Sequence, residues 1–388
     1  MKPQLRRAYL DLPGYPLAGI PEKRRELRAR GVDVIDLGAG DSDLPPPPAV
    51  VEALRSAALD PAHGRYPFQL GLPAYREAVA LWMKGRFGVE LDAYSEILPL
   101  IGSKEGIAHL PLAFLEPGDI TVIPDPGYQA YRGGTILAGG VPHLVPLRPE
   151  HGFRVPLEEL PADVLGRMRI LYLNYPNNPT AASVDLEYLK SAVDLCREVG
   201  AVLVHDHAYS EIAFDGYRPP SILEIPGASD VAVEFHSLSK TYNMTGWRLG
   251  WAAGSSELIG ALSRVKSFMD TGAFLAVQAA GVAALESHSS WVPGNVAAFE
   301  NRRDRGLAAL RSAGFEPPTP KATMYLWVPV PAGEPSLEFA QRALDQQGVV
   351  ILPGGALGPG GEGFFRIALT VGADRLEEAA NRLSSIVA

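Results

Sequence analysis

The sequence contains a single cysteine, Cys196, among 388 residues, and this scarcity excludes a framework of internal disulfides. It has no apolar run near the roughly 18 residues that a membrane-spanning helix needs, and no apolar stretch of signal-peptide type at its N-terminus. Acidic residues outnumber basic ones, 44 to 35, and the net charge of −9 argues against a nucleic-acid partner. We therefore expect a soluble cytoplasmic protein that binds neither membranes nor nucleic acid.

The chain divides by its texture into three segments. Residues 1–45 form an arm that is irregular at first and then contains a charged helix and a short strand. The run of prolines at residues 45–48 is stiff and marks a boundary. Residues 46–280 make a large domain, and residues 281–388 a smaller one. With 47% hydrophobic residues, the chain is long enough to bury a large core.

Strands and helices alternate through the large domain. We expect strands at residues 96–100, 120–123, 141–147, 170–173, 201–204, 231–236 and 249–253. We expect helices at residues 50–59, 71–87, 105–115, 128–138, 186–199 and 257–270. This alternation predicts an α/β fold with a mostly parallel sheet covered by helices on both faces.

The last segment has a different pattern. Helices at 297–312 and 336–347 frame strands at 324–328 and 364–368, which predicts a smaller α+β domain. We expect the N-terminal arm to return to this domain. The glycine-rich run at 358–363 leads into a strand and not a helix, so it predicts a turn and not a dinucleotide-binding loop.

The stretch from Ser237 to Gly250 carries the strongest chemical signal. Lys240 follows a buried strand and has no carboxylate within three positions. Because ligands bind at the carboxyl ends of parallel strands, this amine is placed to react with a carbonyl carbon. Arg248 lies eight residues further on between apolar neighbours. A hydroxyl, a lysine and an arginine together suit an aldehyde that carries a phosphate, although a structural turn would also explain them.

Two further strand ends carry groups of the same kind. Ser103 and Lys104 begin a helix after a strand, where backbone N–H groups can bind an anion. Tyr128 follows Pro124-Asp125-Pro126-Gly127 and could stack on a flat ring. Taken alone, Ser103 and Lys104 are better explained as an ordinary capped helix, and core packing explains Tyr128 as well as stacking does.

The strands at 170–173 and 201–204 also end in polar groups. Asn178 precedes a proline, which favours an extended backbone that can direct its amide into a cleft. Asp206 alternates in direction with His205 and His207, and as a buried carboxylate it needs a cationic partner such as a protonated pyridine nitrogen. A metal site built from these three residues is the alternative, and their opposed directions make it awkward.

Two other residues lie outside these strand ends. Tyr66 could reach a site across a dimer interface, or it could be an ordinary surface or core tyrosine. Arg366 lies within an apolar strand, where a guanidinium needs a carboxylate from the protein or from a substrate.

Together these segments resemble the class I/II aminotransferases of the fold-type I pyridoxal-phosphate enzymes, over nearly the whole chain. The most specific are Ser237-Leu238-Ser239-Lys240 with Arg248, Asn177-Asn178-Pro179-Thr180, and Asp206-His207-Ala208-Tyr209. Within the family, the stretches at 35–41 and 101–106 are most similar to the LL-diaminopimelate and aspartate aminotransferase-like branch. The resemblance implies an L-amino acid donor, a 2-oxo acid acceptor such as 2-oxoglutarate, ping-pong kinetics and a homodimer.

The resemblance also implies roles for residues at matching positions. Lys240 would hold pyridoxal 5′-phosphate as an internal aldimine, and Asp206 would pair with the ring nitrogen. Tyr209 and Asn178 would contact the phenolic oxygen, and Tyr128 would stack on the ring. Lys240, Asp206 and Tyr209 are the implied catalytic residues.

The remaining implied contacts concern the phosphate and the substrate. The phosphate would be held by Ser103, Lys104, Ser237, Arg248 and Tyr66 of the partner subunit. The substrate α-carboxylate would bind Arg366, with Asn178 and Gly40 beside it. No metal ligand is implied.

Side-chain specificity is not settled by the resemblance. Residues 268–272 read Phe-Met-Asp-Thr-Gly, where the diaminopimelate-type pattern has an Asn-Ile-Asp-Ser-Gly-like segment. No arginine for a second substrate carboxylate can be placed from the sequence. Other activities on the same fold, a C–S lyase or a decarboxylase, remain alternatives. So do a non-catalytic cofactor-binding regulatory module and a metal-dependent hydrolase centred on His205 and His207.

Overall fold

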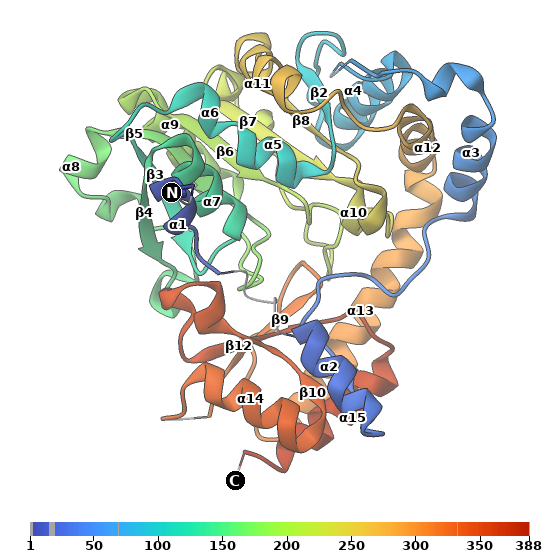
Figure 1. Ribbon diagram of the computed structural model, residues 1–388, viewed down its shortest axis with the longest axis vertical. Coiled ribbons are helices and arrows are strands. Elements are labelled where there is room, and N and C mark those ends of the chain that lie inside the picture. The colour runs from blue at the N-terminus through green and yellow to red at the C-terminus, as the bar shows by residue number, and fades with distance from the viewer. Residues whose placement is uncertain (1–2, 15–19, 69, 332, 388) are drawn as a thin grey trace.

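The computed structural model describes residues 3–14, 20–68, 70–331 and 333–387. Figure 1 shows two lobes, a large one that contains the main sheet and a smaller one that contains the C-terminus. None of the helices in these residues combines the length and the apolar character that crossing a membrane requires.

The large lobe is built around a seven-stranded sheet with the order β2-β8-β7-β6-β5-β3-β4. The strands are β2 (Ile97–Leu100), β3 (Ile120–Asp125), β4 (Val141–Pro146), β5 (Met168–Leu173), β6 (Val202–Asp206), β7 (Ala232–Ser237) and β8 (Gly250–Gly254). Only β8 runs antiparallel to its neighbours, so the predicted mostly parallel sheet is confirmed.

Helices cover both faces of this sheet, because its strands are apolar on both sides. The helices are α3 (Pro48–Ala58), α4 (Pro73–Phe87), α5 (Ser103–His109), α6 (Pro111–Phe114), α7 (Gln129–Ala138), α8 (Ala162–Leu165), α9 (Leu186–Val199), α10 (Leu238–Thr241), α11 (Ser256–Met269) and α12 (Leu275–Glu286). Buried residues of α5, α7 and α11 pack on one face. Those of α4, α9 and α12 pack on the other.

The predicted helix at 105–115 is wrong as a single helix. The chain forms α5 and then α6, and Pro111 is the first residue of α6. Proline has no N–H to donate, so it is well placed at a helix start and badly placed inside a helix. The strand and helix predictions elsewhere in the sheet differ from the structure by a few residues at their ends.

The small lobe combines short strands with long helices, as predicted. Its elements are α2 (Ile20–Ala29), β1 (Ile35–Asp36), β9 (Tyr325–Pro329), α14 (Ser336–Gln347), β10 (Val349–Val350), β11 (Leu352–Pro353), β12 (Phe364–Ala368) and α15 (Ala373–Ser384). The arm does return to this lobe, because β1 pairs in parallel with β10. A further short helix, α1 (Arg7–Leu10), lies near α7 of the large lobe.

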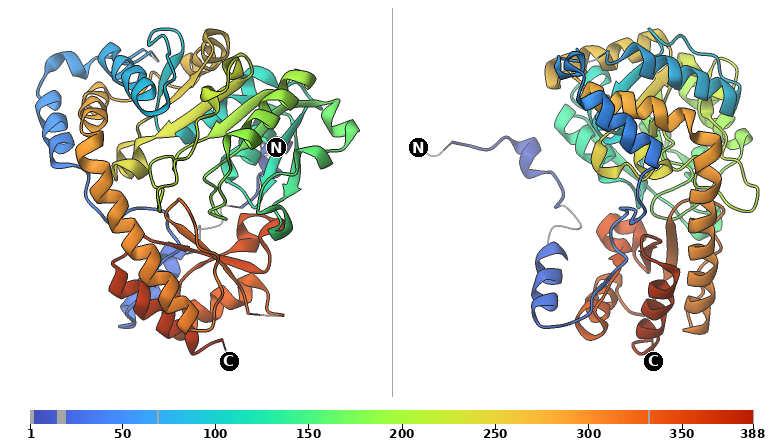
Figure 2. Two further views of the ribbon diagram at one scale, coloured as in Figure 1. Left: turned by 180° about the vertical axis from the view of Figure 1, so that it is seen from behind. Right: turned by 90° about the vertical axis from the view of Figure 1, so that its right-hand side faces the viewer.

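One long helix, α13 (His288–Ser312), connects the two lobes, and Figure 2 shows it running from one into the other. Its residue Val292 packs in the core of the large lobe, whereas Phe299 and Leu307 pack in the core of the small lobe. The sequence predicted this helix only from residue 297 and did not predict α12 or α15. The domain boundary at residue 281 stays a prediction, since α12 packs with the large lobe.

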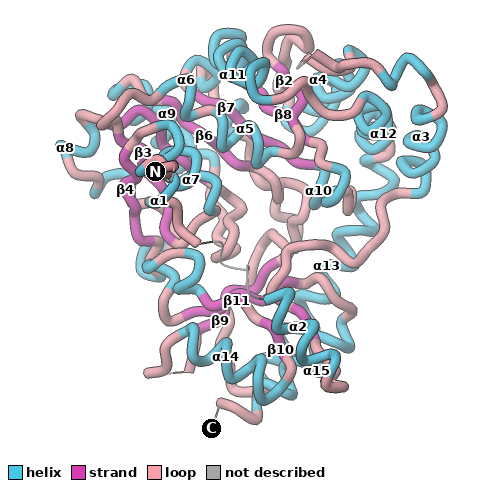
Figure 3. Tube along the Cα trace, in the orientation of Figure 1, coloured by secondary structure: helices cyan, strands magenta, loops and turns pink. Residues whose placement is uncertain are grey.

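The carboxyl ends of the parallel strands face the small lobe. Figure 3 shows that loops make up most of the chain between the two lobes. The glycine-rich run at 358–363 is a turn that leads into β12, as predicted. Gly360 N donates a hydrogen bond to Asp125 Oδ2 at the end of β3 (2.9 Å), which ties this turn to the large lobe.

Candidate active site

A cavity of about 290 Å³ lies where the strand ends meet the small lobe. The residues that line it are Gly40, Ser103, Lys104, Tyr128, Asn174, Asn178, Asp206, Ala208, Tyr209, Ser237, Ser239, Lys240, Thr245, Arg248, Tyr325 and Arg366. All the residues that the sequence predicted for the site are present except Tyr66. Segments that range from Gly40 to Arg366 in the sequence thus meet at one point, as the strand-end argument requires.

Lys240 lies in α10, the short helix that follows β7. Its Nζ donates a hydrogen bond to the carbonyl oxygen of Gly40 (2.5 Å), so the arm reaches the amine directly. Ser237 starts α10, and its Oγ accepts from Ser239 N (3.2 Å). Gly40 needs to be a glycine, because a Cβ there would lie 2.1 Å from the hydroxyl of Tyr325. The amine of Lys240 is therefore held inside the cavity and not in open solvent.

Asp206 is the last residue of β6 and is only 6% exposed. Its Oδ2 accepts a hydrogen bond from the hydroxyl of Tyr131 (2.8 Å), and its Oδ1 is buried without a partner among the described residues. Burial raises the pKa of this carboxyl to about 6, against the opposing effect of Tyr131. A carboxylate in this position is stabilised by any cation that enters the cavity.

Arg366 projects from β12 of the small lobe and joins both lobes and the arm. Its Nη1 donates to Asn178 Oδ1 (2.8 Å) and its Nη2 to the carbonyl oxygen of Gly38 (2.6 Å). The guanidinium lies 4.1 Å from the ring centre of Tyr325. Asn178 is itself fixed, because its N–H donates to Asn174 Oδ1 (2.8 Å).

Tyr209 and Tyr325 face each other with their hydroxyl oxygens 3.1 Å apart. Burial opposes ionisation of Tyr325, but the positive charges of Arg366 and Lys240 outweigh it and lower its pKa. Burial raises the pKa of Tyr209 instead, and the neighbouring Tyr325 adds to this rise. The pair is thus polarised, with Tyr325 as the stronger hydrogen-bond donor.

Basic groups gather at the start of α5. Arg248 adopts a left-handed backbone (φ 57°) and donates from Nη1 to the carbonyl oxygen of Thr245 (2.8 Å). Gly102 also has a positive φ (72°), and a Cβ there would lie 2.3 Å from Nη2 of Arg248. Burial and the nearby Arg248 lower the pKa of Lys104. Two cations beside the first N–H groups of a helix favour an anion at this end of the cavity.

Tyr66 lies outside this cavity. Its side chain is among the exposed large apolar side chains, at 71% exposure. Its role at a partner's site therefore stays a prediction that a single chain cannot test.

The histidines flanking Asp206 point away from it. His205 and His207 form a buried group with Glu234, and these three could geometrically hold a metal ion. However, His205 Nδ1 lies 2.9 Å from Glu234 Oε2 and its Nε2 lies 3.1 Å from the carbonyl oxygen of Tyr175. Glu234 also accepts from Ser221 and His236. The metal site proposed from His205, Asp206 and His207 is wrong in its ligand set, because Asp206 faces the other side of the sheet.

Comparisons with known proteins agree with this geometry. The model of the family "Aminotransferase class I and II" matches residues 32–383. The chain belongs to the class I and II aminotransferases.

Similar aminotransferases include two curated relatives. The LL-diaminopimelate aminotransferase of Desulforudis audaxviator is 51% identical over 96% of this chain and 95% of its own length. That of Moorella thermoacetica is 48% identical over 97% of both chains. Membership in this family makes the protein a transferase of amino-acid metabolism and implies pyridoxal phosphate as its cofactor.

Solved structures of aminotransferases share the fold. A probable N-succinyldiaminopimelate aminotransferase from Thermus thermophilus is 40% identical, with a TM-score of 0.90 over 95% of this chain and 99% of its own. BacF from Bacillus subtilis, with bound substrate, is 32% identical, with a TM-score of 0.95 over 100% and 98% of the two chains.

Several polar residues in or next to the aminotransferase site were not predicted, among them Tyr325, Tyr131 and Asn174. Tyr325 starts β9 and Tyr131 lies within α7, so both read as ordinary core residues in their segments. Asn174, whose Nδ2 donates to the carbonyl oxygen of Asp206 (2.7 Å), follows β5 directly. Its place at a strand end was the only available signal.

Proposed function

We propose that this aminotransferase binds pyridoxal 5′-phosphate in the Lys240 cavity and moves an amino group between LL-diaminopimelate and a 2-oxo acid, with 2-oxoglutarate as the acceptor. One observation carries the cofactor assignment. The buried carboxylate of Asp206, with one oxygen unpartnered, lines the same cavity as the amine of Lys240.

The residues present fit this cofactor. A protonated pyridine nitrogen would supply the cation that Asp206 Oδ1 lacks, which offsets the cost of burying that charge. Lys240 would hold the aldehyde carbon through its amine. Tyr128 would pack on the ring, and Asn178 and Tyr209 would donate to its phenolic oxygen.

The opposite end of the cavity fits the phosphate. Arg248, Lys104 and the hydroxyl of Ser237 surround the start of α5, where Ser103 contributes backbone and side-chain donors. Arginine and lysine beside backbone N–H groups are a common arrangement for phosphate.

When bound, the cofactor supplies a ring that delocalises the electron pair left on the substrate α-carbon. The chain contributes orientation and proton transfer. Lys240 Nζ, once free, takes the proton from the substrate α-carbon as a general base. It then gives the proton up as a general acid to complete the amino transfer. Asp206 would supply the negative charge that keeps the ring nitrogen protonated. The hydroxyl of Tyr325, 3.1 Å from that of Tyr209, would strengthen the hydrogen bond of Tyr209 if it donates to it.

Arg366 would bind the substrate α-carboxylate in a bidentate arrangement. In the cofactor-free protein its fork is occupied by Asn178 Oδ1 and by the carbonyl oxygen of Gly38. Both are neutral acceptors, so a carboxylate would compete effectively. Gly40, on the same arm, would close over the substrate.

A homodimer is part of this proposal. Tyr66 and Phe68 precede α4 and are strongly exposed, as are Phe268 and Phe274 around the start of α12. Gln278 of α12 accepts from Leu72 N (2.7 Å) and thereby holds the two segments together. An apolar surface of this kind is typical of a protein interface. The cytoplasmic location stays a prediction.

A direct test starts from the purified protein. With pyridoxal phosphate it should absorb in the visible, and Lys240→Ala should lose that absorbance and lower turnover by orders of magnitude, because the amine acts as both anchor and base. Normal activity in this variant would refute the assignment.

A panel of amino donors with 2-oxoglutarate tests the substrate. LL-diaminopimelate should give the highest kcat/KM, with aspartate and alanine as comparison donors. Release of a 2-oxo acid without any acceptor would instead indicate a lyase. Cofactor binding without turnover across the panel would indicate a regulatory module.

A further inference from the structure

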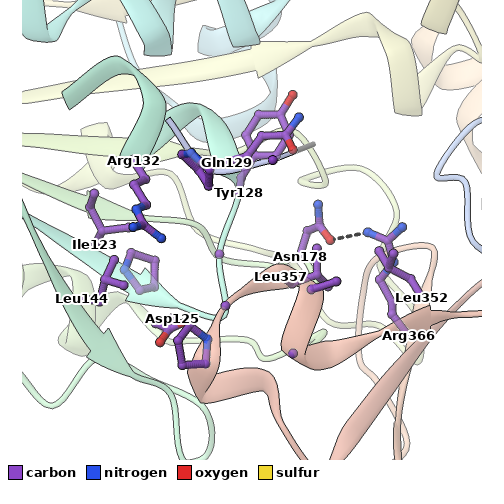
Figure 4. A pocket seen from close by; sticks show the side chains of 18 residues that line it. Ile123, Asp125, Tyr128, Gln129, Arg132, Leu144, Asn178, Leu352, Leu357 and Arg366 are labelled. Atoms are coloured by element: carbon purple, nitrogen blue, oxygen red, sulfur yellow. Dashed lines mark hydrogen bonds between the residues drawn. The ribbon is translucent and has the colours of Figure 1, made fainter. Parts of the chain in front are cut away.

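A second cavity, of about 280 Å³, adjoins the Lys240 cavity. The two share Tyr128, Asn178 and Arg366 in their walls, so a substrate held at Arg366 can extend from one into the other. Its far walls are formed by the end of β3, the first turns of α7 and the residues 355–359 of the small lobe. Figure 4 shows this cavity, with the hydrogen bond between Asn178 and Arg366 on one side.

Arg132 of α7 lies on the other side of this cavity from Arg366 (Figure 4). Among the described lining residues, Arg132 and Arg366 are the only cations and Asp125 is the only anion. The remaining walls are apolar side chains, backbone, and the uncharged Gln129, Tyr128 and Asn178. The cavity therefore has a guanidinium at each side.

The charge of Arg132 is not paired with any carboxylate of the described residues. It forms no hydrogen bond and no ion pair with a described residue, and its Nε is buried without a partner. A guanidinium carries five donors, and leaving one buried and unpaired is costly. By contrast, Arg302 and Arg303, which are buried in the small lobe, are both paired with carboxylates.

An ion pair with Asp125 does not account for the position of Arg132 in the cavity wall. The two attract each other, but they do not approach within ion-pair distance, and Asp125 Oδ2 is already bound to Gly360 N. Asp125 is 5% exposed, and it serves to join the turn at 358–361 to the large lobe. Asp125 therefore leaves the donors of Arg132 unsatisfied.

We infer that Arg132 binds the carboxylate at the far end of the substrate side chain. This inference rests on the proposed function, since it takes Arg366 as the site of the α-carboxylate. The substrates selected in this way are amino acids and 2-oxo acids with a second carboxylate, a class that includes LL-diaminopimelate, glutamate and 2-oxoglutarate.

Matched donor pairs test Arg132. L-Lysine is LL-diaminopimelate without its distal carboxylate. Norvaline has a methyl group at the position where glutamate has its distal carboxylate. In Arg132→Gln, kcat/KM for each dicarboxylic donor should fall by about 10- to 100-fold, the value of a hydrogen-bonded charge. For lysine and norvaline it should change little. Arg132→Lys keeps the charge but loses the bidentate guanidinium. Its kcat/KM for the dicarboxylic donors should lie between those of the unchanged protein and Arg132→Gln.

Arg55→Gln is the matched control, because Arg55 is 72% exposed on α3 and far from both cavities. It should behave as the unchanged protein with all four donors. An equal loss for both members of each pair in Arg132→Gln would show a merely structural role and overturn the inference. So would an unchanged preference for the dicarboxylic member.

Calorimetric binding of glutarate and pentanoate separates this inference from the proposed function. With cofactor present, the unchanged protein should prefer glutarate, and Arg132→Gln should lose that preference. If no donor supports amino transfer, the proposed function fails, and the binding result alone decides about Arg132. Equal binding of both acids to the unchanged protein would then overturn it.

Discussion

At the scale of single residues, the protonation state of Asp206 depends on two opposing effects, its burial and the polar and charged groups around it. Burial favours the neutral carboxyl, and within the chain only the Tyr131 hydroxyl, a backbone N–H and two histidines oppose it. The result is a carboxyl with a pKa raised to about 6 that any nearby cation would ionise. The folded chain thus presents a buried carboxyl that suits a cationic ligand.

The raised pKa of Asp206 predicts how the cofactor-free protein responds to pH. The unfolded carboxyl ionises near 3.8 and the folded one near 6. Below 3.8 both states are protonated, and between these values the unfolded state ionises first, so stability falls as pH rises. Above 6 the whole loss of roughly 3 kcal/mol remains.

Asp206→Asn removes this titration and tests it. In urea unfolding without cofactor, the free energy of unfolding of Asp206→Asn should gain about 3 kcal/mol relative to the unchanged protein between pH 4 and pH 7. A difference that stays constant with pH would contradict the prediction.

The residues of the site were predictable where they follow a strand. Lys240, Asp206, Asn178 and Ser103 do so, and their chemistry is unusual for those positions. Tyr325 was not predictable, because its polarity appears only when its hydroxyl meets Tyr209, 116 residues away in sequence.

At the scale of elements, the start of α5 depends on a glycine. Gly102 combines a positive φ with a backbone so close to Arg248 that no side chain fits. In Gly102→Ala the backbone strain costs about 1–2 kcal/mol, and Arg248 has to move away from the phosphate position.

The affinity for pyridoxal phosphate should therefore fall at least tenfold in Gly102→Ala, as measured by the visible absorbance in a titration. Gly85→Ala is the control, since Gly85 lies in α4 with open space around its Cα. It should leave the affinity unchanged and be neutral or slightly stabilising. Equal affinities for both variants would remove the role of Gly102.

The elements missed from the sequence have a physical explanation. Helix α12 carries almost only small and apolar residues on all sides, so no periodicity separates a buried face from an exposed one. The unpredicted strands β10 and β11 are two residues long, and only their pairing defines them. In contrast, α9 has a buried face and an exposed face that the sequence pattern separates clearly, and both of its ends were predicted to the residue.

At the scale of the whole molecule, several large apolar side chains before α4 and around the junction of α11 and α12 are exposed, among them Tyr66, Phe68, Phe268 and Phe274. Phe268 is 85% exposed at the end of α11. If this surface is a dimer interface, a charge at its centre should separate the subunits, because a buried unpaired carboxylate is costly.

Phe268→Asp should sediment as a monomer at concentrations where the unchanged protein is a dimer, and it should lose activity with the loss of Tyr66 of the partner subunit. Leu337→Asp provides the matched control, since Leu337 is 66% exposed on α14 of the small lobe. A dimer that persists in Phe268→Asp would place the interface elsewhere.

The helix α13 has a consequence for how the chain can be divided. Its 25 residues begin in one core and end in the other, with Pro293 near its beginning. A cut at residue 281 would strip the first core of Val292 and leave the second fragment with an unsupported helical end. The two lobes are therefore expected to fold and unfold as one cooperative unit, although they are separate in shape.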